Sequence, residues 1–181
     1  MDISKNLKFI KKMSWENVFD VWRENEDYPG SHWIALWQER GFKSWADWRM
    51  TYANRFQLQD LDWALYEINN HMEFIPQICG GSFSSWVKLF YQGEENPLFS
   101  KIVKHPDVQT HKGILEFMEN FPADTTISAV ILNDKIVVVE GMHRCAAIAL
   151  AGLQGKQIKT KMKICLADHF LDKLPVSGQH S

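Results

Sequence analysis

The sequence predicts an α+β protein, in which a Trp-rich helical region of residues 1–73 packs on a C-terminal α+β region of residues 74–181 with a small mixed sheet. Seven of the eight tryptophans precede residue 64, in stretches with helical spacing, whereas the clearest strand patterns follow residue 125. No low-complexity linker separates the two parts, so they are also compatible with one compact unit.

Serine residues mark the starts of three expected helices in the first part. Ser14 precedes a helix that reaches about residue 23, Ser31 precedes one that Gly41 ends, and Ser44 precedes "WADWRMTYANRF". A fourth helix is expected over residues 58–71. The aromatic residues of the third helix recur at i, i+3, i+7 and i+11: Trp45, Trp48, Tyr52 and Phe56. This spacing favours core packing, with a ligand-binding or base-stacking face as the alternative.

The middle of the chain predicts short helices. Gly80 and Gly81 permit a tight turn before a helix over residues 84–91. Asn96 has the character of an N-cap for a helix that starts at Pro97, and "HKGILEFMEN" predicts another helix.

The period changes to that of strands near residue 125. "TTISAVIL" and "KIVVVE" predict a hairpin, because Asn133 and Asp134 between them tolerate the positive φ of a tight turn. "MHRCAAIALAG" predicts a buried helix with Gly152 at its C′ position. The stretch "IKTKMKICL" predicts a strand with one solvent-facing side, because apolar residues alternate with lysines.

Composition excludes several classes of function. The net charge of −2 supplies no basic field, which argues against nucleic acid as an obligatory partner. We expect a cytoplasmic protein without a membrane association, because no apolar run approaches about 18 residues and the N-terminus lacks the core of a signal peptide. Cys79, Cys145 and Cys165 have no CxxC spacing and are expected to be reduced and buried.

The stretch "VVVEGMHRCAAIALAG", residues 137–152, is the candidate functional site. Its ionisable residues, Glu140, His143 and Arg144, stand at the entrance of an otherwise apolar helix, where charges must be paired or line a crevice. The helix start, the bare Gly141 and the Arg144 donors suit an anion, and His143 could bind it or donate a proton. Glu140 fits three roles that stay open: a Mg²⁺ ligand, a general base, or the structural partner of Arg144.

The motif E-G-M-H-R-C-A-A, with a hairpin before it and an Ala-rich helix and a strand after it, resembles the D/E-G-x-H-R-x-x-A signature of the ParB/sulfiredoxin-like superfamily. The resemblance covers roughly residues 120–167, in its wider form it begins at residue 74 and implies a ParB/sulfiredoxin-like domain over residues 74–181, and it excludes the first 70. It implies a nucleotide, ATP, ADP or CTP with Mg²⁺, whose phosphates contact Gly141, Met142, His143 and Arg144, and it places Glu140 near the reacting group. Met142 stands where sulfiredoxins have their reactive cysteine, which argues against sulfiredoxin chemistry.

We therefore expect a nucleotide- or phosphate-binding protein, with Glu140 and His143 as catalytic residues and Glu140 as a metal ligand if the chain is a phosphotransferase or nucleotide hydrolase. Its partner would be a nucleotide or another phosphorylated small molecule. The alternative is a non-catalytic binding module with a vestigial anion pocket, whose Trp-rich helices contact a protein partner.

Overall fold

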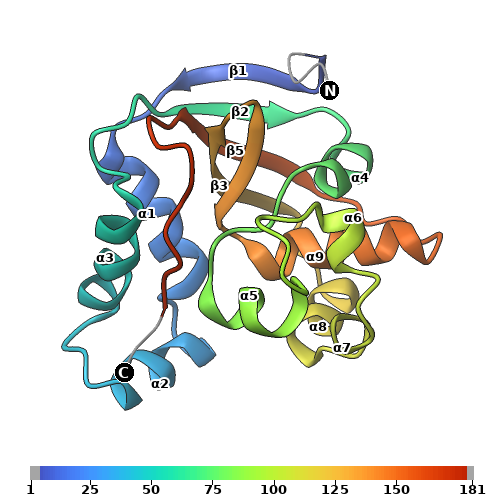
Figure 1. Cartoon of the computed structure of the whole chain (residues 1–181), viewed down its shortest axis with the longest axis horizontal. Helices are drawn as coiled ribbons and strands as arrows, with labels where there is room; N and C mark the ends of the chain where they lie inside the picture. Colours follow the sequence, from blue (N-terminus) through green and yellow to red (C-terminus); the bar gives the residue numbers. More distant parts are fainter. Residues whose placement is uncertain (1–4, 179–181) are drawn as a thin grey trace.

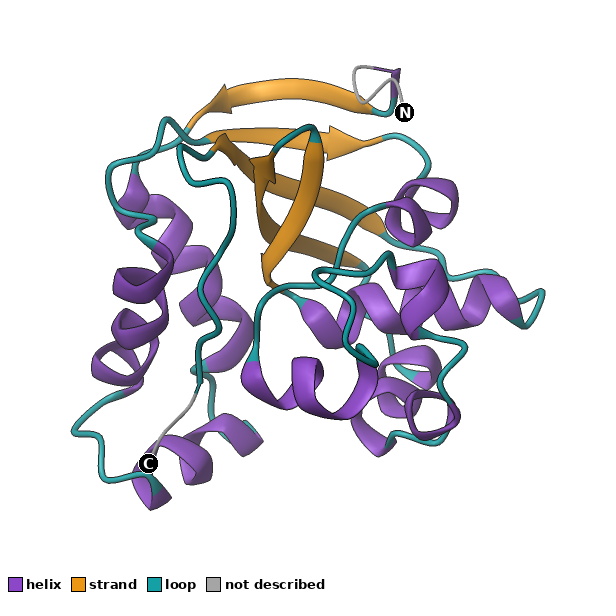
Figure 2. Ribbon diagram, viewed as in Figure 1, coloured by secondary structure: helices purple, strands orange, loops and turns teal. Residues whose placement is uncertain are grey.

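The computed structural model describes residues 5–178 as three layers, a five-stranded mixed sheet with helices on both faces (Figures 1 and 2). This confirms the α+β class. The strand order is β1-β2-β5-β3-β4, and β3 and β5 are parallel while every other neighbouring pair is antiparallel. The strands are β1 (Leu7–Lys12), β2 (Ala64–Ile68), β3 (Asp124–Leu132), β4 (Lys135–Glu140) and β5 (Lys161–Asp168).

The helices divide between the two faces of the sheet. Figure 1 shows α1 (Trp15–Glu26), α2 (His32–Glu39) and α3 (Trp45–Phe56) grouped on one side. On the other side lie α4 (His71–Phe74), a 3₁₀ turn (Ile75–Gln77), α5 (Ser84–Phe90), α6 (Phe99–Ile102), α7 (Pro106–Gln109), α8 (Lys112–Glu119) and α9 (Met142–Leu153). Within residues 5–178 no helix combines the length and the apolar character that crossing a membrane requires.

Alternate residues of each central strand enter one of two hydrophobic cores. Ile127, Val138 and Ile164 face the core built around α9, whereas Val130 and Cys165 face the tryptophans of α1 and α3. The continuously apolar β4 is therefore covered on both faces, as expected from its sequence. The three cysteines are buried and unpaired, also as expected.

The three serine caps are confirmed. The side chain of Ser14 accepts a hydrogen bond from the Asn17 backbone, and Ser44 accepts one from the Asp47 backbone at 3.0 Å. The aromatic face that begins at Trp45 is buried in the core, as the spacing favours.

The prediction of a helix over residues 58–71 is wrong, because this stretch contains β2. Its residues pair on both sides, Ala64 with Lys12 of β1 and with Leu166 of β5. The strand β1 also lies in the region that was expected to be helical. Strand pairing with distant segments overrides the local preference here. The expected boundary between residues 73 and 74 lies within α4, and it separates β1 and β2 from the other three strands of the same sheet.

Two helix ends also differ from expectation. Asn96 does not cap a helix: it has a φ of +46° and donates to the Gly80 carbonyl at 2.8 Å, so that α6 starts only at Phe99. Helix α9 continues through Gly152 to Leu153, and Gly155, with a φ of +70°, takes the left-handed conformation after it.

Candidate functional site

The β4–α9 junction brings the motif residues together at the edge of both cores. Gly141 caps α9 with a φ of +102°, and a Cβ atom there would lie 2.5 Å from Cγ2 of Ile127. A residue without a side chain is therefore required for close contact with β3 as well as for the backbone conformation. The glycine was expected to admit a ligand, but its bare side faces Ile127.

Glu140 and Arg144 form a buried ion pair across the first turn of α9. The Arg144 guanidinium donates to Glu140 Oε1, to the Thr125 hydroxyl and, at 3.1 Å, to the Thr126 carbonyl. Arg144 thus anchors the helix start to the beginning of β3. Of the three roles open to Glu140, the pair with Arg144 is the one that the geometry contains.

Helix α1 completes the environment of Glu140. Asn25 Nδ2 donates to Glu140 Oε2 at 3.2 Å and to the Thr126 carbonyl at 3.0 Å. Both carboxylate oxygens of Glu140 therefore accept a hydrogen bond from the protein. No local sequence pattern indicates that Asn25 contacts Glu140, because the two residues are 115 positions apart in the chain.

A second buried ion pair lies beside the first. The Arg49 guanidinium donates to both oxygens of Glu26, with Nε at 2.5 Å and Nη2 at 2.6 Å, and Trp45 Nε1 donates to Glu26 at 2.9 Å. The guanidinium carbon lies 3.9 Å from the centre of the Trp48 ring, which adds a cation–π contact. This arrangement joins α1 to α3, and the sequence analysis missed both charged residues.

Burial dominates the electrostatics of Glu140. Removal from water raises the pKa of its carboxyl, Arg144 lowers it, and the nearby Glu26 carboxylate raises it again. The net direction is upward, so the site holds a carboxyl group that is easier to protonate than one in water.

His143 projects from the first turn of α9 and is partly buried. Its ring lies 5.3 Å from that of Trp86, 6.1 Å from that of Trp33 and 5.2 Å from that of His111, measured between ring centres. Neither ring nitrogen has a hydrogen-bond partner in the described part of the chain, and neither is fully buried. Burial, followed by His111, lowers the pKa of His143 to about 3, so the imidazole is neutral at pH 7.

Met142 is buried, and its sulfur accepts a hydrogen bond from the Gly81 backbone N–H at 3.2 Å. The two glycines before α5 are not in a left-handed conformation, so their backbone angles alone do not require glycine. A Cβ atom on Gly81 would lie 2.0 Å from the Val138 carbonyl, and one on Gly80 would lie 2.3 Å from the Tyr91 hydroxyl. Close packing against β4 therefore requires Gly81, and close packing against Tyr91 requires Gly80.

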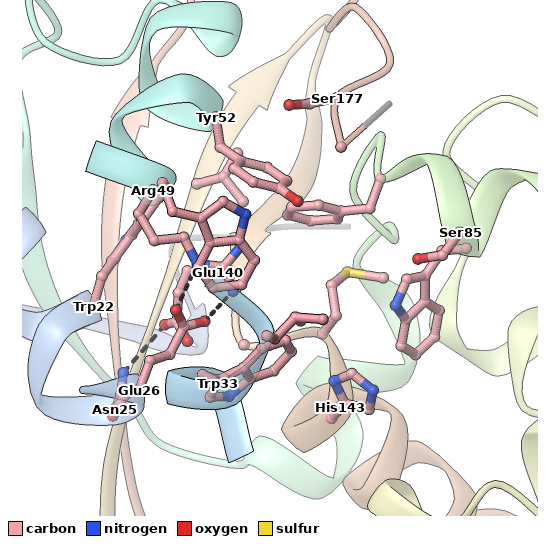
Figure 3. A pocket seen from close by; sticks show the side chains of 18 of the residues that line it. Trp22, Asn25, Glu26, Trp33, Arg49, Tyr52, Ser85, Glu140, His143 and Ser177 are labelled. Carbon is pink, nitrogen blue, oxygen red and sulfur yellow. Dashed lines mark hydrogen bonds and ion pairs between the residues drawn. The ribbon is translucent and has the colours of Figure 1, made fainter. Parts of the chain in front are cut away.

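A cavity of about 230 Å³ opens beside these residues. Its lining comes from α1, α2 and α3 on one side, from α5 and Ser177 on another, and from Glu140 to Arg144 at the β4–α9 junction. Figure 3 shows Trp33 and Ser85 on opposite sides, with His143 between them. The cavity thus places all the predicted site residues together with tryptophans from the N-terminal helices.

The donor set does not fit a metal ion held by the protein. Both oxygens of Glu140 are already engaged by Arg144 and Asn25, and those of the neighbouring Glu26 by Arg49 and Trp45. Across residues 5–178 no cluster of three or more His, Cys, Asp or Glu residues is placed to bind a metal. Mg²⁺ prefers several oxygen ligands, and these carboxylates have no oxygen left to offer it.

No protein-family model, curated protein or solved structure matches this chain. The proposals below therefore depend on the cavity and its residues, and on the motif at the start of α9.

Proposed function

We propose that this protein binds a nucleotide, ATP, ADP or CTP, or another phosphorylated small molecule, in the cavity at the start of α9. The observation that carries the proposal is the cavity of about 230 Å³ that opens onto the E-G-M-H-R motif. The lining combines aromatic rings with a large group of polar and charged side chains, and binding pockets use such polar groups to orient a ligand. Gly141, Met142, His143 and Arg144 are the proposed contact residues, in agreement with the resemblance to the ParB/sulfiredoxin-like superfamily.

The polar groups divide into those that hold the site and those left for a ligand. Arg144 orients Glu140, while the His143 ring makes no hydrogen bond within the described chain and faces the cavity. In the catalytic form of the proposal, Glu140 accepts a proton from an attacking hydroxyl and the neutral His143 imidazole hydrogen-bonds the bound ligand. The upward shift of the Glu140 pKa is of the kind that active-site carboxylates show.

A second candidate function is a non-catalytic binding module. It is favoured by the engagement of both Glu140 oxygens, which leaves this carboxylate in a structural arrangement. A protein partner on the Trp-rich helices has less support, because Trp22, Trp45 and Trp48 are buried in the core and do not form an exposed patch.

The test follows thermal unfolding with ATP, ADP, CTP, GTP, pyrophosphate and sulfate, each with and without Mg²⁺. A ligand that binds only the folded protein stabilises it by about 2.7 kcal/mol at 100 times its dissociation constant. We expect at least one nucleotide to stabilise the wild type and His143→Gln to reduce the effect. The His143 ring makes no hydrogen bond within the described chain, so His143→Gln removes no such bond from the fold. Arg144→Ala would instead break a buried ion pair. If no phosphorylated compound stabilises the protein, the proposal is wrong.

A measurement of nucleotide cleavage distinguishes the catalytic function from the binding module. Wild type is incubated with the nucleotide that binds, and Glu140→Gln is compared with Glu67→Gln, which changes an exposed carboxylate on β2. Loss of nucleotide cleavage in Glu140→Gln alone, with binding retained, supports catalysis. Recovery of the nucleotide unchanged from the wild type supports the binding module.

A further inference from the structure

The cavity is lined by aromatic rings that reach it from helices on both faces of the sheet. Trp33 and Tyr52 come from α2 and α3, and Phe83 and Trp86 come from the segment around α5. Trp33 and Trp86 both have edge contacts with His143, at ring-centre distances of 6.1 and 5.3 Å. Aromatic faces of this kind pack favourably against another planar ring.

The volume of the cavity limits what enters it. An apolar cavity of about 150 Å³ accommodates benzene, whereas pockets for larger ligands begin at about 300 Å³. At about 230 Å³ the cavity matches the size of one ring system of one or two fused rings. The remainder of a larger ligand must lie outside.

The buried charged side chains of the lining form ion pairs with one another, whereas one exposed charged side chain of the lining does not. Glu26 pairs with Arg49 and Glu140 pairs with Arg144, so the interior offers no unpaired charge. Arg40 also lines the cavity, is exposed, and makes no ion pair with any residue between 5 and 178. Its guanidinium lies over the Trp48 ring at 5.5 Å, within reach of a charged group outside.

We infer that the cavity receives an uncharged, planar heteroaromatic ring, edged by His143 and enclosed by Trp33 and Trp86, while the charged part of the same ligand lies outside beside Arg40. The neutral His143 imidazole supplies one donor and one acceptor for heteroatoms on the ring edge. Two sources share this chemistry, a nucleobase and the indole ring of tryptophan. The inference rests on the proposed function in that it takes the same cavity as the ligand site.

The experiment measures binding by titration calorimetry with adenosine, cytidine and L-tryptophan as ring-containing probes, and with pyrophosphate and ribose 5-phosphate as probes without an aromatic ring. Ser85→Trp fills the cavity from an exposed position of α5, and Lys88→Trp places the same side chain on that helix outside the cavity. We expect a ring-containing probe to bind, Ser85→Trp to weaken it at least about tenfold, and Lys88→Trp to change it by no more than about twofold.

Each outcome decides between the ring inference and the proposed function. Binding of a nucleoside or of L-tryptophan, lost in Ser85→Trp alone, supports the ring inference and identifies the source of the ring. Binding of pyrophosphate or ribose 5-phosphate without any ring-containing probe overturns the ring inference and leaves the proposed function in place. Binding of L-tryptophan, with no phosphorylated compound bound, supports the ring inference and overturns the proposed function. If neither the ring probes nor the phosphorylated compounds bind, both are wrong.

Discussion

The side-chain amide of Asn25, at the end of α1, lies 3.2 Å from the Glu140 carboxylate at the end of β4. The same amide nitrogen donates to the Thr126 carbonyl at 3.0 Å, so one side chain ties the Trp-bearing helices to the start of β3 and to the motif. Through this contact the first 73 residues determine the environment of the candidate site. Asn25 acts on the site by positioning Glu140.

Replacement of Asn25 by Asp should destabilise the protein by about 1–3 kcal/mol, because it removes the donor and places a second negative charge beside Glu140. The free energy of unfolding in urea measures the loss. Asn17→Asp, on an exposed position in the first turn of the same helix, makes the same change of charge and should be neutral or slightly stabilising. Equal effects of the two substitutions would show that the Asn25 contact contributes nothing.

Replacement of Arg144 by Met should cost about 3–5 kcal/mol, because it leaves the Glu140 carboxylate buried without its cation. The double variant Glu140→Met/Arg144→Met should recover part of this loss, and a double-mutant cycle by urea unfolding measures the coupling. Arg23→Met is the control: its pair with Asp20 is half-exposed, and its loss should cost less than about 1 kcal/mol. Additive effects at Glu140 and Arg144 would contradict the ion pair.

The loss in Arg144→Met should also depend on pH. Burial raises the pKa of Glu140 in the folded protein, and removal of Arg144 removes the main influence that lowers it. A carboxyl whose folded pKa is raised contributes stability that is present below its unfolded pKa and is lost as the pH rises through the folded value. The variant should therefore approach the wild type in stability as the pH falls toward about 4.5, the ordinary pKa of the carboxyl, and the difference should change no further below it. An unchanged difference between pH 4 and pH 8 would contradict this sign.

Features set by neighbouring residues were predictable from the sequence. The β3–β4 hairpin follows from Asn133 and Asp134, which have φ values of +47° and +64°, and the three serine caps follow from their own helices. The gathering of Glu140, His143 and Arg144 at the start of α9 is also local, because all three lie within residues 140–144, where β4 passes into α9.

Features set by distant pairing were not predictable in the same way. The strand β2 forms between β1 and β5, and β5 is about 100 residues further along the chain, so no window of sequence contains its partners. Likewise Asn25, Glu26 and Arg49 enter the site only because α1 and α3 cover the sheet. Their residue types are ordinary for helix surfaces, and only tertiary packing distinguishes them.

Replacement of Gly81 by Ala should destabilise the protein by about 3 kcal/mol or more, because the added Cβ would lie 2.0 Å from the Val138 carbonyl and would displace the Met142 contact. Thermal unfolding measures the effect. Gly113→Ala in α8 is the matched control, since its Cβ would meet only ordinary contacts at 3.5 Å or more. That change should stabilise the helix by about 0.5–1 kcal/mol. A Gly81→Ala protein as stable as the wild type would show that the loop is free to move away from β4.

His143 should make the folded protein sensitive to acid. Burial, then the electrostatic influence of His111, His32, Arg49 and Arg144, lowers the pKa of His143 from 6.5 to about 3. A base with a lowered folded pKa contributes stability that is fully present above its unfolded pKa, and this stability is lost as the pH falls from 6.5 toward 3.

Within that range His143 should cost up to about 1.4 kcal/mol for each unit by which the pH falls. In His143→Gln this part of the loss is absent. The free energy of unfolding of the variant should therefore equal that of the wild type above pH 7, and should exceed it by a growing margin as the pH falls from 6.5 to 4. Urea unfolding at intervals of half a pH unit measures the difference between the two proteins. Parallel curves over this range would mean that His143 is protonated in the folded protein as easily as in water, and the neutral imidazole required at the ring edge would then be lost near pH 6.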